Sequence, residues 1–199
     1  MLGALRAQRV MAIVRAGGAE QAYTAATGLV DAGLRVVEVS LSTPQALDAV
    51  EWLVRRHDGV AAIGVGTVLD AADVDRAAGI GASFIVAPTL NPAVVRAAAA
   101  HGLASFPGCA TPSEMWQAAG LGATGVKIFP ASLWTPQALA DLLHALPGLR
   151  CVPTGGVRLD DIPAWLAAGA LAVGLGSALA GESAVARVLE AVSLAPGPP

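Results

Sequence analysis

The stretch Phe84-Ile-Val-Ala-Pro-Thr89 is followed by Asn91-Pro92, an alanine-rich run and Gly102, and this order of residues is the clearest indication of the fold. A short apolar run of this kind, rich in β-branched residues, predicts a buried strand. Asn91 is a good helix cap, and a proline at the first helical position loses no hydrogen bond. Gly102 supplies the left-handed residue on which helices end. The stretch therefore reads as one strand–helix unit of a parallel sheet.

The same unit recurs eight times along the chain. The predicted strands are residues 10–15, 36–41, 61–67, 84–89, 103–108, 124–130, 150–156 and 172–179. Other predicted helices begin at Thr43-Pro44, Thr111-Pro112 and Thr135-Pro136 or end at Gly33, Gly81 and Gly169. Eight regular units favour a closed sheet, so we predict a single α/β domain, a (β/α)8 TIM barrel, over residues 1–194. A doubly wound open sheet is the alternative, and residues 195–199 are expected to form a flexible C-terminal tail.

Composition argues against several classes of protein. With 199 residues, a net charge of −3 and 14% charged residues, the chain has no basic surface suited to nucleic acid. A hydrophobic fraction of 55% and a mean hydropathy of +0.62 suggest a membrane protein, and residues 162–181 carry no charge. That run contains Pro163, Ser177 and several glycines, however, so we interpret it as buried structure and expect no membrane association.

The cysteines and histidines show no pattern of metal ligands. Cys109 and Cys151 lack metal-type spacing, and no pair among His57, His101 and His144 has it either. We therefore expect two buried thiols in a reducing cytoplasm, with no metal and no other cofactor.

Lys127 is the single lysine of the chain, and all eleven other basic side chains are arginine. It stands among apolar residues in the sixth predicted strand. A guanidinium keeps its proton near neutral pH, whereas a desolvated ammonium can lose it, and only the free amine attacks a carbonyl. The pattern favours a nucleophilic amine. The alternative is a lysine whose head reaches water past the end of the strand.

Catalytic groups of such barrels lie at the carboxyl ends of the strands. We therefore expect the polar residues at the ends of the predicted strands to lie together at one end of the barrel. Glu38 has apolar neighbours on both sides in the second strand, where burial raises a carboxyl pKa and suits general acid–base chemistry. A structural ion pair is the alternative reading of Glu38. Thr154-Gly-Gly156 and Gly174-Leu-Gly-Ser177 end the seventh and eighth strands, the usual phosphate site of this architecture. Tight turns without a ligand are the alternative there.

These residues together resemble the class I aldolases of 2-keto-3-deoxy-6-phosphogluconate, 2-keto-3-deoxy-6-phosphogalactonate and 4-hydroxy-2-oxoglutarate. The resemblance extends over residues 10–181. Its most specific motifs are Gly122-x3-Val126-Lys127-Ile-Phe-Pro-Ala131 and Gly33-x4-Glu38-Val-Ser-Leu41. Gly64-Val-Gly-Thr67, Pro107-Gly108, Pro153-Thr-Gly-Gly-Val157 and Gly176-Ser177 match in order and spacing.

The resemblance implies roles for individual side chains. Lys127 would form an imine with the substrate, Glu38 would shuttle protons and Phe129 would shield the imine. Arg15 and Thr67 would hold the carboxylate region. The remaining substrate-binding residues would be Pro88 and Thr154, together with Gly155, Gly156, Gly176 and Ser177 around the phosphate.

The implied reaction is reversible cleavage of a phosphorylated 2-keto-3-deoxy sugar acid to pyruvate and glyceraldehyde 3-phosphate, and 4-hydroxy-2-oxoglutarate is a further candidate substrate. The resemblance also implies a homotrimer in the cytoplasm. Ser42 stands where many gluconate-type members have arginine, which favours the galactonate branch, whereas Thr154 favours the gluconate branch. The configuration at C4 stays open. A non-covalent phosphate-binding isomerase, epimerase or decarboxylase and a non-catalytic relative are the alternative functions.

Overall fold

Helices and strands alternate along the chain. The structure, a computed structural model, describes residues 1–181 and 183–197. The strands are β1 (Val10–Val14), β2 (Val36–Ser40), β3 (Ala62–Gly66), β4 (Phe84–Val86), β5 (Ala104–Phe106), β6 (Gly108–Cys109), β7 (Val126–Ile128), β8 (Cys151–Pro153) and β9 (Val173–Leu175). The helices are α1 (Leu2–Gln8), α2 (Ala19–Asp31), α3 (Ala46–Arg56), α4 (Ala71–Gly79), α5 (Pro92–Ala100), α6 (Pro112–Gly120), α7 (Pro136–Ala145), α8 (Ile162–Ala167) and α9 (Ala184–Ser193). Short 3-10 turns follow β7, β8 and β9 as η1 (Ala131–Leu133), η2 (Leu159–Asp161) and η3 (Ser177–Leu179).

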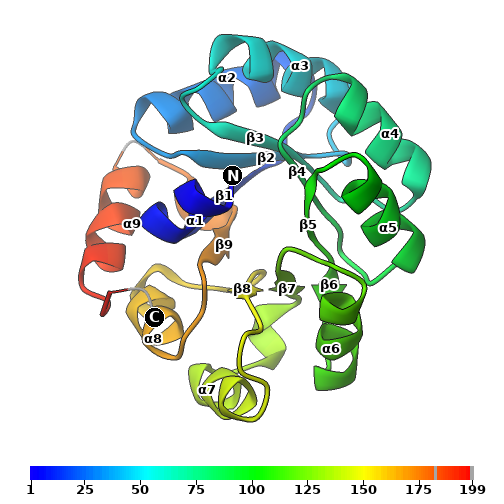
Figure 1. Ribbon diagram of the computed structural model, residues 1–199. Helices are drawn as coiled ribbons and strands as arrows, with labels where there is room; N and C mark the ends of the chain where they lie inside the picture. Colours follow the sequence, from blue (N-terminus) through cyan, green and yellow to red (C-terminus); the bar gives the residue numbers. More distant parts are fainter. Residues whose placement is uncertain (182, 198–199) are drawn as a thin grey trace.

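The strands form a closed parallel ring surrounded by helices (Figure 1). Six strands pair in the order β5-β4-β3-β2-β1-β9, and three in the order β6-β7-β8. Contacts at both seams join these sheets. The Thr124 amide, just before β7, donates to the Ser105 carbonyl of β5 at 3.0 Å, and Thr154, directly after β8, bridges to Gly174 of β9. The predicted TIM barrel is therefore confirmed, and the open-sheet alternative is wrong.

The fifth strand differs from its prediction, because it is interrupted at Pro107. Residues 103–108 were expected to form one strand, but β5 ends at Phe106 and β6 begins at Gly108. Proline has no N–H to donate to a neighbouring strand, so the regular pairing stops there. The barrel thus has eight strand positions, with β5 and β6 sharing the fifth.

Helix starts were predicted well where the capping contact is local. Asn91, Thr111 and Thr135 each accept a backbone N–H from the first turn of their own helix. The prediction that Thr43-Pro44 opens a helix is wrong, because α3 begins at Ala46. The Thr43 hydroxyl instead accepts the backbone N–H of Ala16, at 3.1 Å, after β1.

The first helix, α1, was not predicted and closes the N-terminal end of the barrel. Its Leu5 is fully buried and packs in a cluster with Met11, Phe84 and Phe106 inside the ring. In Figure 1, α1 lies in front of the strands and inside the circle of outer helices. Because α1 fills the amino ends of the strands, the polar residues at the carboxyl ends form the open end.

The outer layer of the core lies between the ring and the helices. Alternate strand residues such as Val10, Ala12 and Val14 pack outward in that layer, so Met11 and Ile13 face the interior. Residues 162–181 fold into α8, β9 and η3, in agreement with their interpretation as buried structure. No helix of the described residues is long and apolar enough to cross a membrane.

The structure describes residues 195–197 of the predicted C-terminal tail. The Arg9 guanidinium donates to the carbonyls of Pro196 and Leu166. Pro198 and Pro199 lie outside the described residues. That residues 195–199 form a flexible tail therefore stays a prediction.

Candidate active site

Lys127 and Glu38 lie in one hollow inside the barrel. Lys127 is the middle residue of β7 and Glu38 the middle residue of β2, and they are 4% and 1% exposed. Both line an interior space too narrow for a water molecule, together with Met11, Ile13, Val86, Phe106, Val152 and Thr154. The reading of Lys127 as a lysine that reaches bulk water does not fit this burial.

Glycine on the neighbouring strand makes room for the Glu38 carboxylate. A Cβ atom at Gly66 of β3 would lie only 2.7 Å from Glu38 Oε1. One pleat below, a Cβ at Gly64 would lie 2.5 Å from the ring of Phe84. Any larger residue at either position would collide with its neighbour, so the two glycines of β3 shape the space around the acid.

Burial raises the pKa of Glu38, and the positive charges of Lys127 and Arg15 oppose that shift. Its Oε2 atom is buried without a hydrogen-bond partner among the described residues. Within the same part of the chain Glu38 belongs to no ion pair of 4.0 Å or less, so the structural ion-pair reading finds no partner. A buried, unpartnered carboxyl that holds its proton more tightly than usual is suited to give and take protons near neutral pH.

Burial also lowers the pKa of Lys127, while the Glu38 carboxylate opposes this shift and the Arg15 charge adds to it. The lysine Nζ lies 4.9 Å from the centre of the Phe129 ring. Both effects of burial favour the uncharged forms, an amine at Lys127 and a carboxylic acid at Glu38. The amine is the form that attacks a carbonyl carbon.

A cavity of about 250 Å³ opens beside this hollow at the carboxyl ends of the strands. The two spaces share Ile13 and Thr154 in their walls. The predicted residues that line this cavity are Arg15, Phe129, Thr154, Gly155, Gly156, Gly176 and Ser177. The structure therefore brings most of the predicted substrate-binding residues together next to Lys127.

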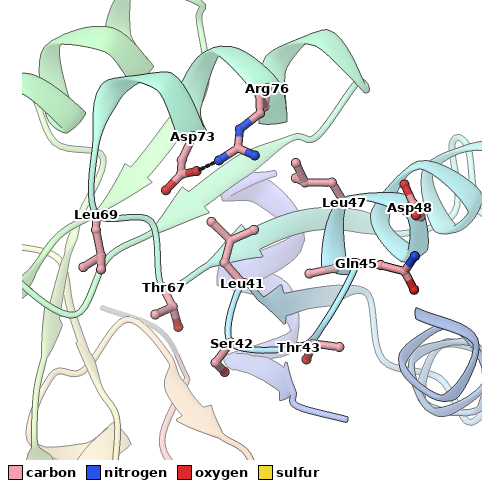
Figure 2. A pocket seen from close by; sticks show the side chains of 11 residues that line it. Leu41, Ser42, Thr43, Gln45, Leu47, Asp48, Thr67, Leu69, Asp73 and Arg76 are labelled. Carbon is pink, nitrogen blue, oxygen red and sulfur yellow. Dashed lines mark hydrogen bonds and ion pairs between the residues drawn. The ribbon is translucent and has the colours of Figure 1, made fainter. Parts of the chain in front are cut away.

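Thr67 and Arg15 line two different pockets. Thr67 lines a wider pocket of about 630 Å³ formed by the segments after β2 and β3, with Ser42 and Arg76 (Figure 2). Its backbone has a φ of +63°, a strained conformation for a β-branched residue. Its hydroxyl bonds to the Ser40 hydroxyl at 2.7 Å, and Ser40 bonds to Ser42 at the same distance. This pocket is larger than the cavity beside Lys127, but neither Lys127 nor Glu38 lines it.

Pro88 is half-buried in the segment after β4. Its carbonyl oxygen is in tight contact with β6, because a Cβ at Gly108 would lie 2.2 Å from that oxygen. No group of three His, Cys, Asp or Glu side chains in the described part of the chain could hold a metal ion.

Comparison with known proteins assigns the family. A family model described as KDPG and KHG aldolase matches residues 2–191. The chain belongs to this family. It is 36% identical over 177 residues to the 2-dehydro-3-deoxy-6-phosphogalactonate aldolase of Escherichia coli (strain K12), covering 87% of this chain and 86% of the relative.

Solved structures agree with this membership of the KDPG and KHG aldolases. A native KDPGal structure superposes with a TM-score of 0.83 at 35% identity, covering 93% of this chain and 91% of that one. A KDPG aldolase from Legionella pneumophila, with pyruvate captured at low pH as a covalent carbinolamine intermediate, has a TM-score of 0.82 at 26% identity and covers 98% of both chains.

Two residues of the site were missed in the sequence. Ser40 is fully buried and links Thr67 to β2, and its signal was its place two residues after Glu38 on the same face of the strand. Arg158 lines the cavity beside Lys127, and its signal was its place directly after the Gly155-Gly-Val157 turn.

Proposed function

We propose that this chain is a class I aldolase that reversibly cleaves a 2-keto-3-deoxy-6-phospho sugar acid to pyruvate and glyceraldehyde 3-phosphate. The observation that carries the proposal is the burial of Lys127 and Glu38 in one hollow, where burial shifts both pKa values toward the neutral forms. A neutral amine next to an acid–base group is what formation of an imine requires.

The reaction begins when the neutral amine of Lys127 adds to the C2 ketone. The Glu38 acid donates the proton with which water leaves, so that a protonated imine forms and Glu38 becomes a carboxylate. Glu38 as the carboxylate then takes the proton of the C4 hydroxyl. The electrons of the C3–C4 bond move toward the imine, so that an enamine forms and the aldehyde leaves. Glu38 returns a proton to C3 of the enamine. Hydrolysis of the resulting imine releases pyruvate and restores the free amine.

The surrounding side chains would hold the two ends of the substrate. Arg15 and Thr67 would bind the carboxylate region, and Phe129 would shield the imine from water. Arg15 lines the cavity beside Lys127, and Thr67 is tied to β2 through Ser40. Pro88 and Thr154 would shape the sugar-acid site. Gly155, Gly156, Gly176 and Ser177 would bind the phosphate, since all four line one cavity.

Two observations favour the galactonate configuration at C4. Ser42 leaves the segment after β2 without an arginine, and the Escherichia coli relative at 36% identity carries a phosphogalactonate name. Steady-state kinetics with the two phosphorylated epimers tests this preference. A higher kcat/KM for the gluconate epimer would contradict it.

The experiment that tests the aldolase function compares Lys127→Arg with the wild type. The substitution keeps a positive charge but removes the nucleophile, so cleavage should fall to the background rate while circular dichroism shows a folded barrel. A folded Lys127→Arg variant that still cleaves the sugar acid would favour a non-covalent mechanism instead.

We also propose that the protein is a cytoplasmic homotrimer. Trp116 on α6 and Leu133 on η1 are 61% and 74% exposed, which supports a subunit contact over this region. Cys109 and Cys151 are buried free thiols, in keeping with a reducing compartment. Light scattering tests the trimer, which requires three times the chain mass of 19.8 kDa. A Trp116→Glu variant should dissociate it.

A further inference from the structure

The cavity beside Lys127 is lined by two arginines and by no acidic side chain. Arg15 follows β1, and Arg158 stands in the loop after β8. We propose that Arg158 binds the phosphate group of the substrate and thereby sets the preference of this chain for phosphorylated over unphosphorylated ketoacids. The inference rests on the proposed aldolase function and adds a side-chain contact to its glycine loops.

The loop that carries Arg158 is held in place by the segment after β7. The Ser132 amide donates to the Gly155 carbonyl at 3.0 Å, and the Ala131 amide donates to the Thr154 carbonyl at 2.8 Å. A Cβ at Gly156 would lie 2.9 Å from the Ser132 Cβ, so the backbones approach closely. The position of the loop is therefore fixed relative to the strand of Lys127.

This loop offers donors that the protein itself does not use. Gly155 and Gly156 have φ values of +84° and +87°, which turn the chain tightly around the cavity wall. The amide N–H groups of Gly156 and Val157 donate to no acceptor in residues 1–181 and 183–197. Successive free N–H groups in such a turn form a concave site for an anion.

The Arg158 side chain is free to take a new partner. Its one ion pair among the described residues is with Asp160, at 3.9 Å, and the two side chains are 76% and 80% exposed. An exposed pair of this kind contributes little, so a phosphate dianion can displace the carboxylate. Guanidinium binds phosphate through two parallel hydrogen bonds and adds a full positive charge, which backbone amides lack.

The two arginines match the two anionic ends of the proposed substrate. Arg15 stands beside the hollow of Lys127, where the carboxylate next to the imine must lie. Arg158 stands beside the free amides of the glycine turn, where the phosphate would lie. A substrate without phosphate would leave Arg158 unused and gain nothing from it.

The experiment measures the binding of glycerol 3-phosphate by calorimetry and the kinetics of cleavage, in the wild type and three variants. Arg158→Gln should weaken glycerol 3-phosphate binding about tenfold, as expected for loss of a charged hydrogen bond, and raise KM for the phosphorylated substrate about as much. Its KM for 4-hydroxy-2-oxoglutarate should not change. Asp160→Asn removes the competing carboxylate and should tighten glycerol 3-phosphate binding.

Arg150→Gln is the matched control. It removes the same charge at the opposite end of the strand, where Arg150 precedes β8 and donates to the Thr124 carbonyl at 3.1 Å. Its glycerol 3-phosphate affinity should equal that of the wild type.

Three results would overturn the inference: an Arg158→Gln variant that binds glycerol 3-phosphate as the wild type does, a wild type that does not bind it, or an equal rise of KM for both substrates. Borohydride trapping of pyruvate tests the aldolase function separately, because it does not involve the phosphate site. If glycerol 3-phosphate binding depends on Arg158 but no pyruvate is trapped, the aldolase function fails and the phosphate contact stands.

Discussion

At the scale of single residues, Lys127 and Glu38 set each other's protonation. Burial lowers the pKa of the lysine and raises that of the acid, and each charge partly opposes the shift of the other. Arg15 acts on both groups and favours a neutral amine with a charged carboxylate. Arg15 thus helps to keep Lys127 nucleophilic.

Variants of these neighbours should move the pH profile of imine formation in opposite directions. Glu38→Gln removes a charge that raises the Lys127 pKa, so the midpoint of pyruvate trapping should move to lower pH. Arg15→Gln removes a charge that lowers this pKa, so the midpoint should move to higher pH. The rate of borohydride trapping between pH 5 and 10 measures both. Shifts in the same direction would contradict the account.

The roles of Lys127 and Glu38 could be proposed from the sequence because an unusual residue type in an apolar strand is a local signal. The contacts of Thr67 could not be predicted, because they follow from a strained backbone and a bond to Ser40 on another strand. Residue identity alone does not indicate such a non-local constraint.

At the scale of secondary-structure elements, the glycines of β3 decide what fits inside the barrel. Gly66→Ala should push the Glu38 carboxylate aside and lower kcat about a hundredfold, since a misplacement of about 1 Å costs this much. The added methyl should also destabilise the fold by about 1–3 kcal/mol. Steady-state kinetics and urea denaturation measure these effects.

Gly28→Ala is the control for this substitution. Gly28 lies in α2, and a Cβ there would meet nothing within 4 Å. The change should stabilise the protein by about 0.5–1 kcal/mol and leave kcat unaltered, because glycine is a poor helix former. A Gly66→Ala variant with wild-type kcat would show that the carboxylate position does not matter.

Element boundaries were predictable where the deciding contact is local. Asn91 and Thr111 cap helices through N–H groups two or three residues away. Thr43 looks the same in sequence, but its hydroxyl bonds to Ala16, which is 27 residues away. Whether the Thr43 hydroxyl accepts from a helix N–H or from a distant backbone N–H depends on the folded barrel, so the sequence alone does not predict it.

At the scale of the whole molecule, the eightfold repeat of strand and helix predicted a closed barrel, and the ring confirms it. The helix that closes its N-terminal end was missed. Leu2–Gln8 precedes the first repeat, and its burial depends on Leu5 fitting a cluster whose members come from most of the chain.

Leu5→Ala tests this closure. Removal of a fully buried leucine side chain should destabilise the protein by about 2–5 kcal/mol, measured by urea denaturation. Because Leu5 lies at the end opposite the proposed substrate cavity, kcat well below the melting temperature should change less than about twofold. Leu5→Met conserves volume and should cost less than about 1.5 kcal/mol. A stable Leu5→Ala variant would mean that α1 does not support the ring.

The covalent role of Lys127 is tested most directly by reducing the protein with borohydride in the presence of pyruvate and mapping the adduct by mass spectrometry. Since the chain has one lysine, we predict a single side-chain adduct on the peptide that contains Lys127 and none in Lys127→Arg. A wild type without that adduct, or a Lys127→Arg variant that carries an adduct elsewhere than at the N-terminal amine, would contradict the account.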